Sequence, residues 1–374
     1  MKVVFLSNYF NHHQKPFSDA MYKRLGDDYL FIETDEMGEF RKKLGYEMES
    51  LPSYVIPKEI TDANADEIKK IINDADVLIT GSVEEKYFKE RKKQKKLIFR
   101  YSEKLFKKGR EPLKYIPRFI KYQWLNRQRN IYLLSAGKFA AKDYRKLGLF
   151  RKKAFKWAYF PATVKYDNVD ELISQKKEHS ILWVGRFLKW KHPEVCYEIA
   201  RRLKDDGYSF TIDLIGTIKR PETLNEWAER MDVVEEVKYL GAMKPEEVRA
   251  HMEKSEMHLF TSDEKEGWGA VVNEAMNSAC VVFASDAAGA TSYLIEDGVN
   301  GFSYKSGDID ELYSKVKRIF DDKDLSKSLS KRAYETMCNQ WDSDVVAERF
   351  IALANSILNK ESTDLFKDGP CSPA

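Results

Sequence analysis

Two cations in the second half of the sequence have the type and the spacing that bind phosphate. Arg186 and Lys191 follow the apolar run 180–184 and come just before Pro193, a residue that suits the first turn of a helix. An arginine offers a bidentate fork, a lysine offers a point charge, and a helix N-terminus adds partial positive charge. The residues therefore indicate a phosphate site, although both cations could instead be ordinary surface charges.

Two carboxylates further along the chain could contact the other groups of a phosphate-containing substrate. Glu266 and Glu274 stand eight positions apart around Trp268, between the apolar runs 257–261 and 280–284. In a continuous helix they would be roughly 12 Å apart, whereas cooperating carboxyl pairs in glycosidases lie about 5 to 9.5 Å apart. We therefore expect separate roles, with Glu266 in a loop facing the reacting end and Glu274 one turn into a helix facing hydroxyl groups. Taken singly, the first could complement a helix dipole and the second could be a surface residue.

The elements that must position these residues are short apolar strands that alternate with amphipathic helices. This alternation occurs twice and predicts two parallel sheets, each covered by helices on both faces. We expect strands at 3–7, 29–33, 77–80, 97–100 and 132–135, then at 180–184, 210–215, 236–240, 256–260 and 280–284. We expect helices at 16–25, 63–75, 193–206, 221–230, 245–254, 270–278 and 341–359. Such sheets bind ligands at the carboxyl ends of their strands, so we expect the site in a cleft between the two.

The length supports the same division, because 374 residues exceed what one hydrophobic core usually supports. We predict an N-terminal and a C-terminal Rossmann-like domain, followed by a long helix and a disordered tail. The expected limits are 1–163, 164–340, 341–360 and 361–374.

The composition excludes several classes of protein. Hydrophobic residues make up 43% of the chain and charged residues 33%, and no apolar run approaches the ~20 residues that cross a bilayer. The N-terminus lacks a signal-peptide core, so we expect a cytoplasmic protein. The four cysteines are scattered, which argues against a zinc site or a disulfide framework. The turn after the first strand, 8–15, contains no glycine and therefore does not match a dinucleotide fingerprint.

A basic segment occupies residues 86–130, where 17 lysines and arginines stand against three glutamates. Aromatic residues are interleaved with the charges, which suits the anionic interface of a membrane or an anionic acceptor. A plain solvated helix face is the alternative, and nucleic acid is disfavoured. We expect peripheral attachment to the inner face of the cell membrane and no binding of nucleic acid.

Three segments together resemble a known family. GRFLKWK at 185–191, EGWGAVVNE at 266–274 and SDAAGATSYLIEDGVNGFSY at 285–304 are similar to the retaining nucleotide-sugar glycosyltransferases of family 4, of the bacterial polysaccharide type. The resemblance implies the GT-B fold, in which two Rossmann-like domains have parallel sheets facing across a cleft. In that fold the first domain would lie on the acceptor side, the second would bind the donor, and the helix 341–360 would cross back to the first domain. It also implies transfer of a sugar from a nucleotide-diphosphate sugar to a hydroxyl acceptor with retention of configuration. Such a reaction would serve the synthesis of cell-surface polysaccharide or glycolipid, with a saccharide, a lipid-linked compound or another hydroxyl compound as acceptor.

The resemblance also implies roles for individual residues. Arg186 and Lys191 would hold the donor diphosphate, Glu274 the ribose, and Glu266 would lie at the donor sugar. The donor site would further include Gly185, Gly216 and Tyr239, together with the segment Gly267, Trp268, Gly269, Ala270 and Val271. On the acceptor side of the cleft we consider Asn8, His12, His13, Ser102 and Glu103, although the two histidines could equally be ordinary loop residues. Two departures from the family are a first loop without glycine and a tryptophan at 268, where phenylalanine is commoner.

In this interpretation catalysis consists of stabilising the departing diphosphate. Arg186 and Lys191 would balance the charge that grows as the glycosidic bond breaks, so no metal or cofactor is expected. One alternative is a nucleotide-sugar epimerase of the GT-B fold, which would convert the donor without any acceptor. Another is a non-catalytic membrane-surface binding protein, which would explain the basic segment but not the motifs of the second domain.

Overall fold

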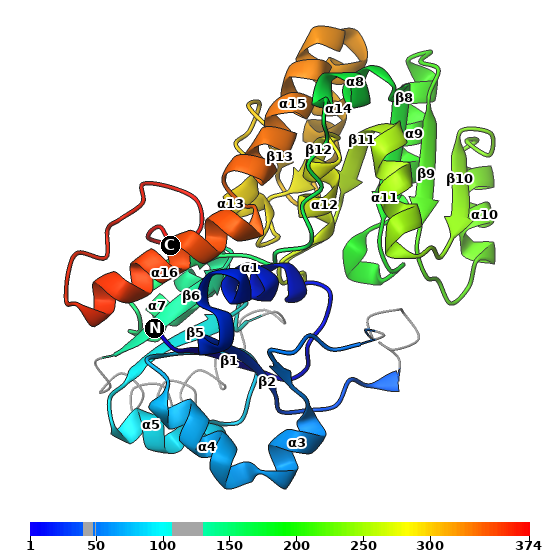
Figure 1. Cartoon of the computed structure of the whole chain (residues 1–374). Helices are drawn as coiled ribbons and strands as arrows, with labels where there is room; N and C mark the ends of the chain where they lie inside the picture. Colours follow the sequence, from blue (N-terminus) through cyan, green and yellow to red (C-terminus); the bar gives the residue numbers. More distant parts are fainter. Residues whose placement is uncertain (40–47, 49, 107–129) are drawn as a thin grey trace. The chain divides into compact units, whose positions relative to one another are not determined.

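The computed structural model describes residues 1–39, 48, 50–106 and 130–374, and the chain divides into two compact units. Unit 1 comprises Met1–Ala162 and Trp341–Ala374, and unit 2 comprises Thr163–Gln340 (Figure 1). The chain therefore leaves unit 1 once and returns to it after residue 340. The predicted limits, 163/164 and 340/341, fall beside these positions.

Unit 1 is built on a parallel sheet of seven strands in the order β3-β2-β1-β4-β5-β6-β7. The strands are β1 Val3–Ser7, β2 Tyr29–Glu33, β3 Val55–Ile56, β4 Val77–Thr80, β5 Leu97–Ser102, β6 Ile131–Ala136 and β7 Ala154–Trp157. The central strands β1 and β4 are buried along their whole length, because their sequences VVFLS and VLIT are apolar on both faces.

Helices cover both faces of this sheet. The described helices of unit 1 are α1 Lys15–Leu25, α3 Lys58–Ala63, α4 Ala65–Asp74, α5 Lys89–Lys93, α7 Lys138–Lys146 and α16 Ser343–Leu358, with 3-10 turns at Gly26–Asp28 and Glu85–Tyr87. Val4 and Leu6 pack with the α4 residue Ile72 on one face. On the other face, Phe350 of α16 lies 6.1 Å from Phe17 of α1, measured between ring centroids. The returning helix α16 is therefore part of the core of unit 1.

The described part of the basic segment is less exposed than the sequence suggests. Arg91 is fully buried, and its guanidinium donates to carbonyl groups that include those of Ala75 (2.6 Å) and Leu97 (2.8 Å). Lys92 is buried in an ion pair with Glu85. The ring of Phe88 is also buried, so these side chains build the core instead of facing a membrane. Residues 107–129 of the predicted basic surface lie outside the described residues.

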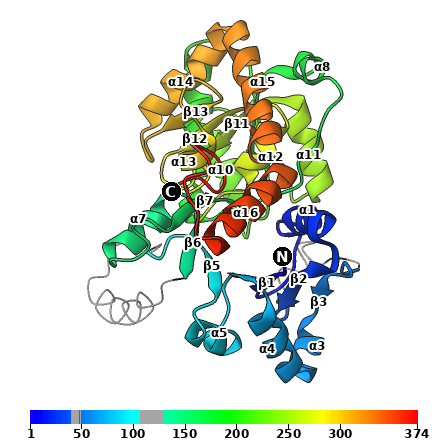
Figure 2. The same cartoon turned by 60° about the vertical axis from the view of Figure 1, so that its left-hand side comes forward.

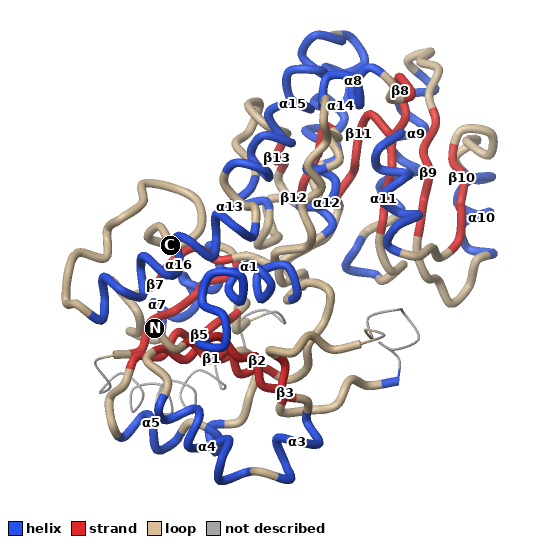
Figure 3. Tube along the Cα trace, in the orientation of Figure 1, coloured by secondary structure: helices blue, strands red, loops and turns tan. Residues whose placement is uncertain are grey.

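Unit 2 is a second parallel sheet, with six strands in the order β10-β9-β8-β11-β12-β13. The strands are β8 Lys177–Val184, β9 Thr211–Ile215, β10 Val237–Gly241, β11 Ser255–Phe260, β12 Val281–Ser285 and β13 Phe302–Tyr304. The helices are α8 Val169–Ser174, α9 Glu194–Asp205, α10 Glu222–Arg230, α11 Pro245–Lys254, α12 Val271–Asn277, α13 Thr291–Leu294, α14 Ile309–Asp321 and α15 Lys323–Asn339. Alternating residues of β8 and β11, such as Trp183 and Leu259, face α9 and α14 in one core cluster. Figure 3 shows the strands of each unit lying between helices.

Both strand orders place the first strand of the unit beside the fourth, so the direction of winding reverses there. The reversal lies between β1 and β4 in unit 1 and between β8 and β11 in unit 2. This topological switch point, at the carboxyl ends of the strands, is where doubly wound sheets bind ligands. The predicted class of two Rossmann-like units is confirmed.

The predicted disordered tail is wrong. Residues 371–374 pair with β7, where Lys156 donates its N–H to the Ser372 carbonyl (2.8 Å) and its own carbonyl accepts from the N–H of Cys371 (2.9 Å). Figure 2 shows this C-terminal segment in red beside β7. Its polar composition suggested disorder, but backbone pairing with an edge strand and burial of Cys371 hold it in place. The described residues contain no helix that is long and apolar enough to cross a bilayer.

Candidate active site

The loops after β8 and β11 meet at the switch point of unit 2. The loop after β8 carries Arg186, which is exposed, and ends in a 3-10 turn, Lys189–Lys191. His192 then adopts a left-handed conformation with φ of 49°, and α9 begins at Glu194. The structure thus places both predicted phosphate-binding cations on one loop that leads into a helix start.

Lys191 and Glu266 form an ion pair across these two loops, with their side chains 14% and 16% exposed. The hydroxyl of Ser262 donates to Glu266 Oε2 at 3.1 Å. The Lys191 ammonium also lies 5.7 Å from the ring centroid of Phe260, a cation–π contact. The positive charge of the site is therefore partly balanced by a carboxylate of the same unit.

Glu274 lies in the first turn of α12 and Glu266 in the loop before it, as the sequence predicts. Burial raises the pKa of Glu274 to about 7, and the charge of Arg249 opposes this rise. A carboxyl group with this pKa exchanges its proton near neutral pH. It can therefore change from a hydrogen-bond donor to an acceptor when a ligand binds.

Gly185 and Gly216 bring the loops after β8 and β9 into direct contact. Gly185 donates its N–H to Ile215 at 2.9 Å, and a Cβ on Gly216 would lie 1.7 Å from the Gly185 carbonyl oxygen. No other residue fits there without movement of the backbone. The Tyr239 hydroxyl donates to the Gly216 carbonyl at 2.9 Å, and its ring packs edge-on against Phe187. These three predicted donor residues therefore lie together.

The segment Gly267–Val271 is held from behind by the loop after β12. The carbonyl groups of Gly267 and Trp268 accept from the N–H groups of Gly289 (3.2 Å) and Ala290 (3.0 Å). The Trp268 side chain is buried, and its indole N–H donates to Asn273 at 2.8 Å. The ring is therefore a packing element.

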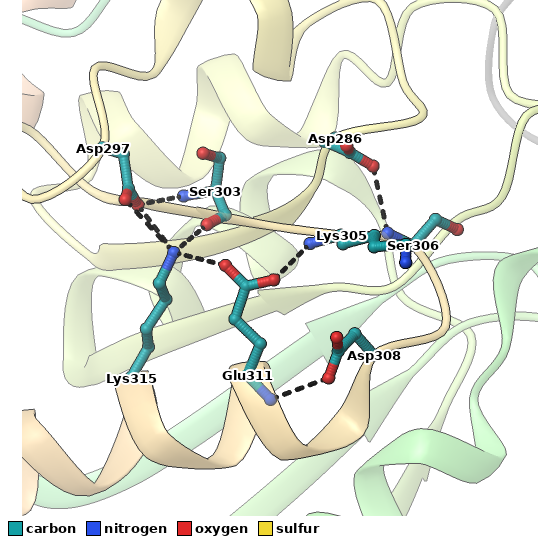
Figure 4. A network of polar contacts seen from close by, with 8 residues as sticks. All are labelled: Asp286, Asp297, Ser303, Lys305, Ser306, Asp308, Glu311 and Lys315. Atoms are coloured by element: carbon teal, nitrogen blue, oxygen red, sulfur yellow. Dashed lines mark hydrogen bonds and ion pairs between the residues drawn. The ribbon is translucent and has the colours of Figure 1, made fainter.

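A polar network fixes the neighbouring loops at the carboxyl ends of β12 and β13 (Figure 4). The Lys315 ammonium contacts Asp297 Oδ1 at 3.1 Å and Glu311 Oε1 at 2.8 Å. Glu311 also accepts from the N–H of Lys305 (2.9 Å), and Asp286 accepts from the N–H of Ser306 (3.0 Å). Since these carboxylates are engaged by N–H groups and an ammonium, the network serves to hold the loops in place.

In unit 1 the predicted residues Asn8, His12 and His13 lie in the loop after β1, again at a switch point. The Asn8 carbonyl accepts from two N–H groups, and the two histidine rings are 3.9 Å apart. Burial, together with the neighbouring His12, lowers the pKa of His13 to about 3. His13 is therefore neutral at physiological pH and cannot supply positive charge to a phosphate.

Ser102 is the last residue of β5 and Glu103 directly follows it, on the same edge of the sheet. The Tyr159 hydroxyl donates to Glu103 Oε1 at 2.7 Å, and the Tyr159 ring stacks on His13 with centroids 5.9 Å apart. The Tyr144 hydroxyl donates to Ser102 at 3.1 Å. The structure thus connects His13 with Glu103 through an aromatic ring, an arrangement of rings and a carboxylate that suits a sugar.

Sequence reasoning missed several residues of these sites. In unit 2 they are Thr261, Ser262 and Asp263, which directly follow β11, and in unit 1 Tyr159, which follows β7. Their place just after a strand was the available signal.

Part of unit 2 is similar to a known protein family. Residues 165–336 match the family model described as glycosyl transferases, group 1, and this segment contains both cations and both glutamates discussed above. The sequence has no match among curated proteins.

Several solved structures are similar to the whole chain. Anabaena HepE in complex with UDP has a TM-score of 0.69 at 16% identity, covering 96% of this chain and 100% of that one. A variant of S. aureus TarM in complex with fondaparinux, α-GlcNAc-glycerol and UDP has a TM-score of 0.64 at 11% identity, covering 95% and 100%. The lipopolysaccharide outer core galactosyltransferase WaaB has a TM-score of 0.65 at 15% identity, covering 96% and 100%. At these identities the likeness shows the fold, which is GT-B.

Proposed function

We propose that this protein is a glycosyltransferase that moves a sugar from a nucleotide-diphosphate sugar to a hydroxyl acceptor. The observation that carries the proposal is the meeting of Lys191 and Glu266 at the switch point of unit 2, inside the segment that matches the group 1 family. The similar HepE binds UDP and UDP-glucose, and the similar TarM variant binds UDP together with saccharides, which supports a nucleotide-sugar donor.

In the proposed mechanism, the donor diphosphate binds at the loop after β8. Arg186 and Lys191 stabilise the charge that develops on the diphosphate as the glycosidic bond breaks, so the reaction needs no metal ion. Glu274 holds the ribose, Glu266 faces the donor sugar, and the backbone of Gly267–Val271 completes the contacts. We further propose that the acceptor attacks from the face that the diphosphate leaves, which retains the anomeric configuration, as in the glycosyltransferases of family 4.

The acceptor is proposed to bind unit 1 near Glu103, Tyr159 and His13. A carboxylate accepts hydrogen bonds from sugar hydroxyl groups, and an aromatic ring packs against the apolar face of a sugar. The neutral imidazole of His13 adds a hydrogen-bonding group without charge. This combination supports a saccharide or lipid-linked saccharide as acceptor, consistent with a role in cell-surface polysaccharide or glycolipid synthesis.

We also propose that the enzyme works in the cytoplasm at the inner face of the cell membrane. Within the described residues, Lys93, Lys95 and Lys96 of the basic segment are exposed. Each lysine near an anionic surface contributes about 1 kcal/mol to binding. Replacing all three with glutamine should reduce sedimentation with phosphatidylserine vesicles. Equal sedimentation of the variant and the unchanged protein would contradict this part of the proposal.

The test of the activity begins with a thermal-shift screen of UDP-, GDP-, ADP- and dTDP-sugars, because a ligand that binds the native state raises the melting temperature. Product analysis with and without an acceptor then separates transfer from epimerisation. Lys191→Ala should lower transfer by about 10²- to 10³-fold, as loss of a transition-state charge contact does. Lys189→Ala, an exposed cation on the same loop, is the matched control. Comparable turnover in both variants would reject the phosphate site.

A further inference from the structure

A buried hydroxyl connects the central strand of unit 2 to the backbone of Lys191. The indole N–H of Trp183, on β8, donates to Thr261 Oγ1 at 2.9 Å. The Thr261 hydroxyl in turn donates to the carbonyl oxygen of Lys191. Trp183 is 2% and Thr261 4% exposed, so water does not replace either bond. The chain of contacts runs from the core of the sheet to the candidate phosphate-binding lysine.

The neighbouring residues fix the same loop to the end of β11. The N–H of Asp263 donates to the Trp190 carbonyl at 2.8 Å, and Asp263 Oδ2 lies 3.5 Å from His192 Nε2. Two successive carbonyl groups of the loop are thus held: the Trp190 carbonyl by the N–H of Asp263 and the Lys191 carbonyl by the hydroxyl of Thr261. The lysine side chain itself is long and flexible, so its backbone must be fixed if the ammonium is to return to one place.

We infer that Thr261 is a positioning residue for the donor diphosphate, acting through Lys191. This inference rests on the proposed function. The hydroxyl both accepts and donates, so it sets the distance between β8, β11 and the 3-10 turn at once. Without it, the indole N–H and the Lys191 carbonyl lose buried partners, and the turn shifts to recover them. A shift of about 1 Å in a charged contact lowers catalysis by up to about 10²-fold.

The test uses Thr261→Val, which keeps the shape and removes the hydroxyl, and Thr261→Ser, which keeps the hydroxyl. Calorimetry measures binding of whichever of UDP, GDP, ADP and dTDP raises the melting temperature of the unchanged protein most. We expect the valine variant to bind about tenfold more weakly and the serine variant to bind within about twofold of the unchanged protein. Ser326→Ala is the matched control, because Ser326 is buried and donates to Glu256 at the opposite end of β11 (2.5 Å).

A double-mutant cycle separates positioning from general stability. If Thr261 acts through Lys191, adding Thr261→Val to Lys191→Ala should change the affinity by less than about twofold, since the two effects share one path. An equal loss in both backgrounds, or an equal loss in Ser326→Ala, would overturn the inference. Unchanged affinity in Thr261→Val would overturn it as well. If the unchanged protein binds none of the four diphosphates, the proposed function fails and the inference fails with it.

Discussion

Replacing Glu266 with glutamine should strengthen the binding of a free nucleoside diphosphate while it weakens sugar transfer. The Glu266 carboxylate is paired with the Lys191 ammonium. A diphosphate that uses this ammonium has to displace the carboxylate. Glutamine keeps an oxygen that can accept the hydrogen bond from Ser262 but has no charge with which to compete. The same variant should lose transfer, because Glu266 is proposed to face the donor sugar.

The size of the effect follows from the burial of the pair. Exposed ion pairs contribute about 0.2 to 1 kcal/mol, whereas breaking a buried pair costs about 3 to 5 kcal/mol. The side chains of Lys191 and Glu266 are 14% and 16% exposed, which is between these limits, and solvent screens part of the attraction. We therefore expect a gain of about 1 to 2 kcal/mol, which is a factor of about 5 to 30 in affinity.

Calorimetric titration with the nucleoside diphosphate measures this gain directly. Glu264→Gln is the control, because Glu264 is exposed in the same loop and its replacement changes the net charge equally. A general electrostatic effect would raise the affinity similarly in both variants and would refute the competition. An affinity in Glu266→Gln that is equal to or below that of the unchanged protein would refute it too.

Three further predictions concern other parts of the chain. Burial raises the pKa of Glu274 to about 7, while an unfolded glutamate titrates near 4.5, so the folded state loses about 3 kcal/mol of stability as the pH rises from about 4.5 to 7. In urea titrations at several pH values, Glu274→Gln should remove this loss. Gly216→Ala should lower the free energy of unfolding by about 3 kcal/mol or more and abolish nucleotide binding, because the alanine Cβ would collide with the Gly185 carbonyl oxygen. Arg91→Lys should lower the unfolding free energy of unit 1 by about 2 to 4 kcal/mol, because carbonyl groups lose their donors.

Each of these has an outcome that contradicts it. A Glu274→Gln variant with the same pH dependence as the unchanged chain would show that another group carries the slope. Full nucleotide affinity in Gly216→Ala would mean that the loops after β8 and β9 can separate without effect. For Arg91, the control is Lys93→Gln, an exposed charge on the same helix that should change stability by less than about 0.5 kcal/mol. Equal losses in both variants would contradict a structural role for the guanidinium.

The sequence was sufficient to predict the continuously apolar strands near the centre of the first sheet, and the reason is physical. A strand buried on both faces is a continuous apolar run, so β1, β2 and β4 were predicted at their observed bounds. Strands β3, β7 and β13 were missed. They are two to four residues long, and short runs such as AFKW do not stand out from loops. Pairing with a neighbouring strand, and not local composition, makes them strands.

The candidate site also has residues that the sequence could predict and contacts that it could not. Arg186, Lys191, Glu266 and Glu274 could be selected from residue type and spacing. The contacts of Thr261 could not, because they depend on the register of β11 against β8 and on which side chain of β8 reaches it. The burial of the basic segment could not be predicted for a related reason. A run of charged residues is typical of an exposed surface, but the Arg91 side chain points inward and donates to carbonyl groups at the end of α4.

The C-terminal segment beside β7 has a consequence for association between molecules. β7 is the last strand of its sheet, and a free edge offers unpaired N–H and C=O groups to any extended chain nearby. Ser372, Cys371 and Ala374 occupy such groups at Lys156 and Ala154. The segment thus blocks this edge strand from pairing with another molecule, and a chain truncated before residue 371 would be open to fibril-like stacking through the edge of β7.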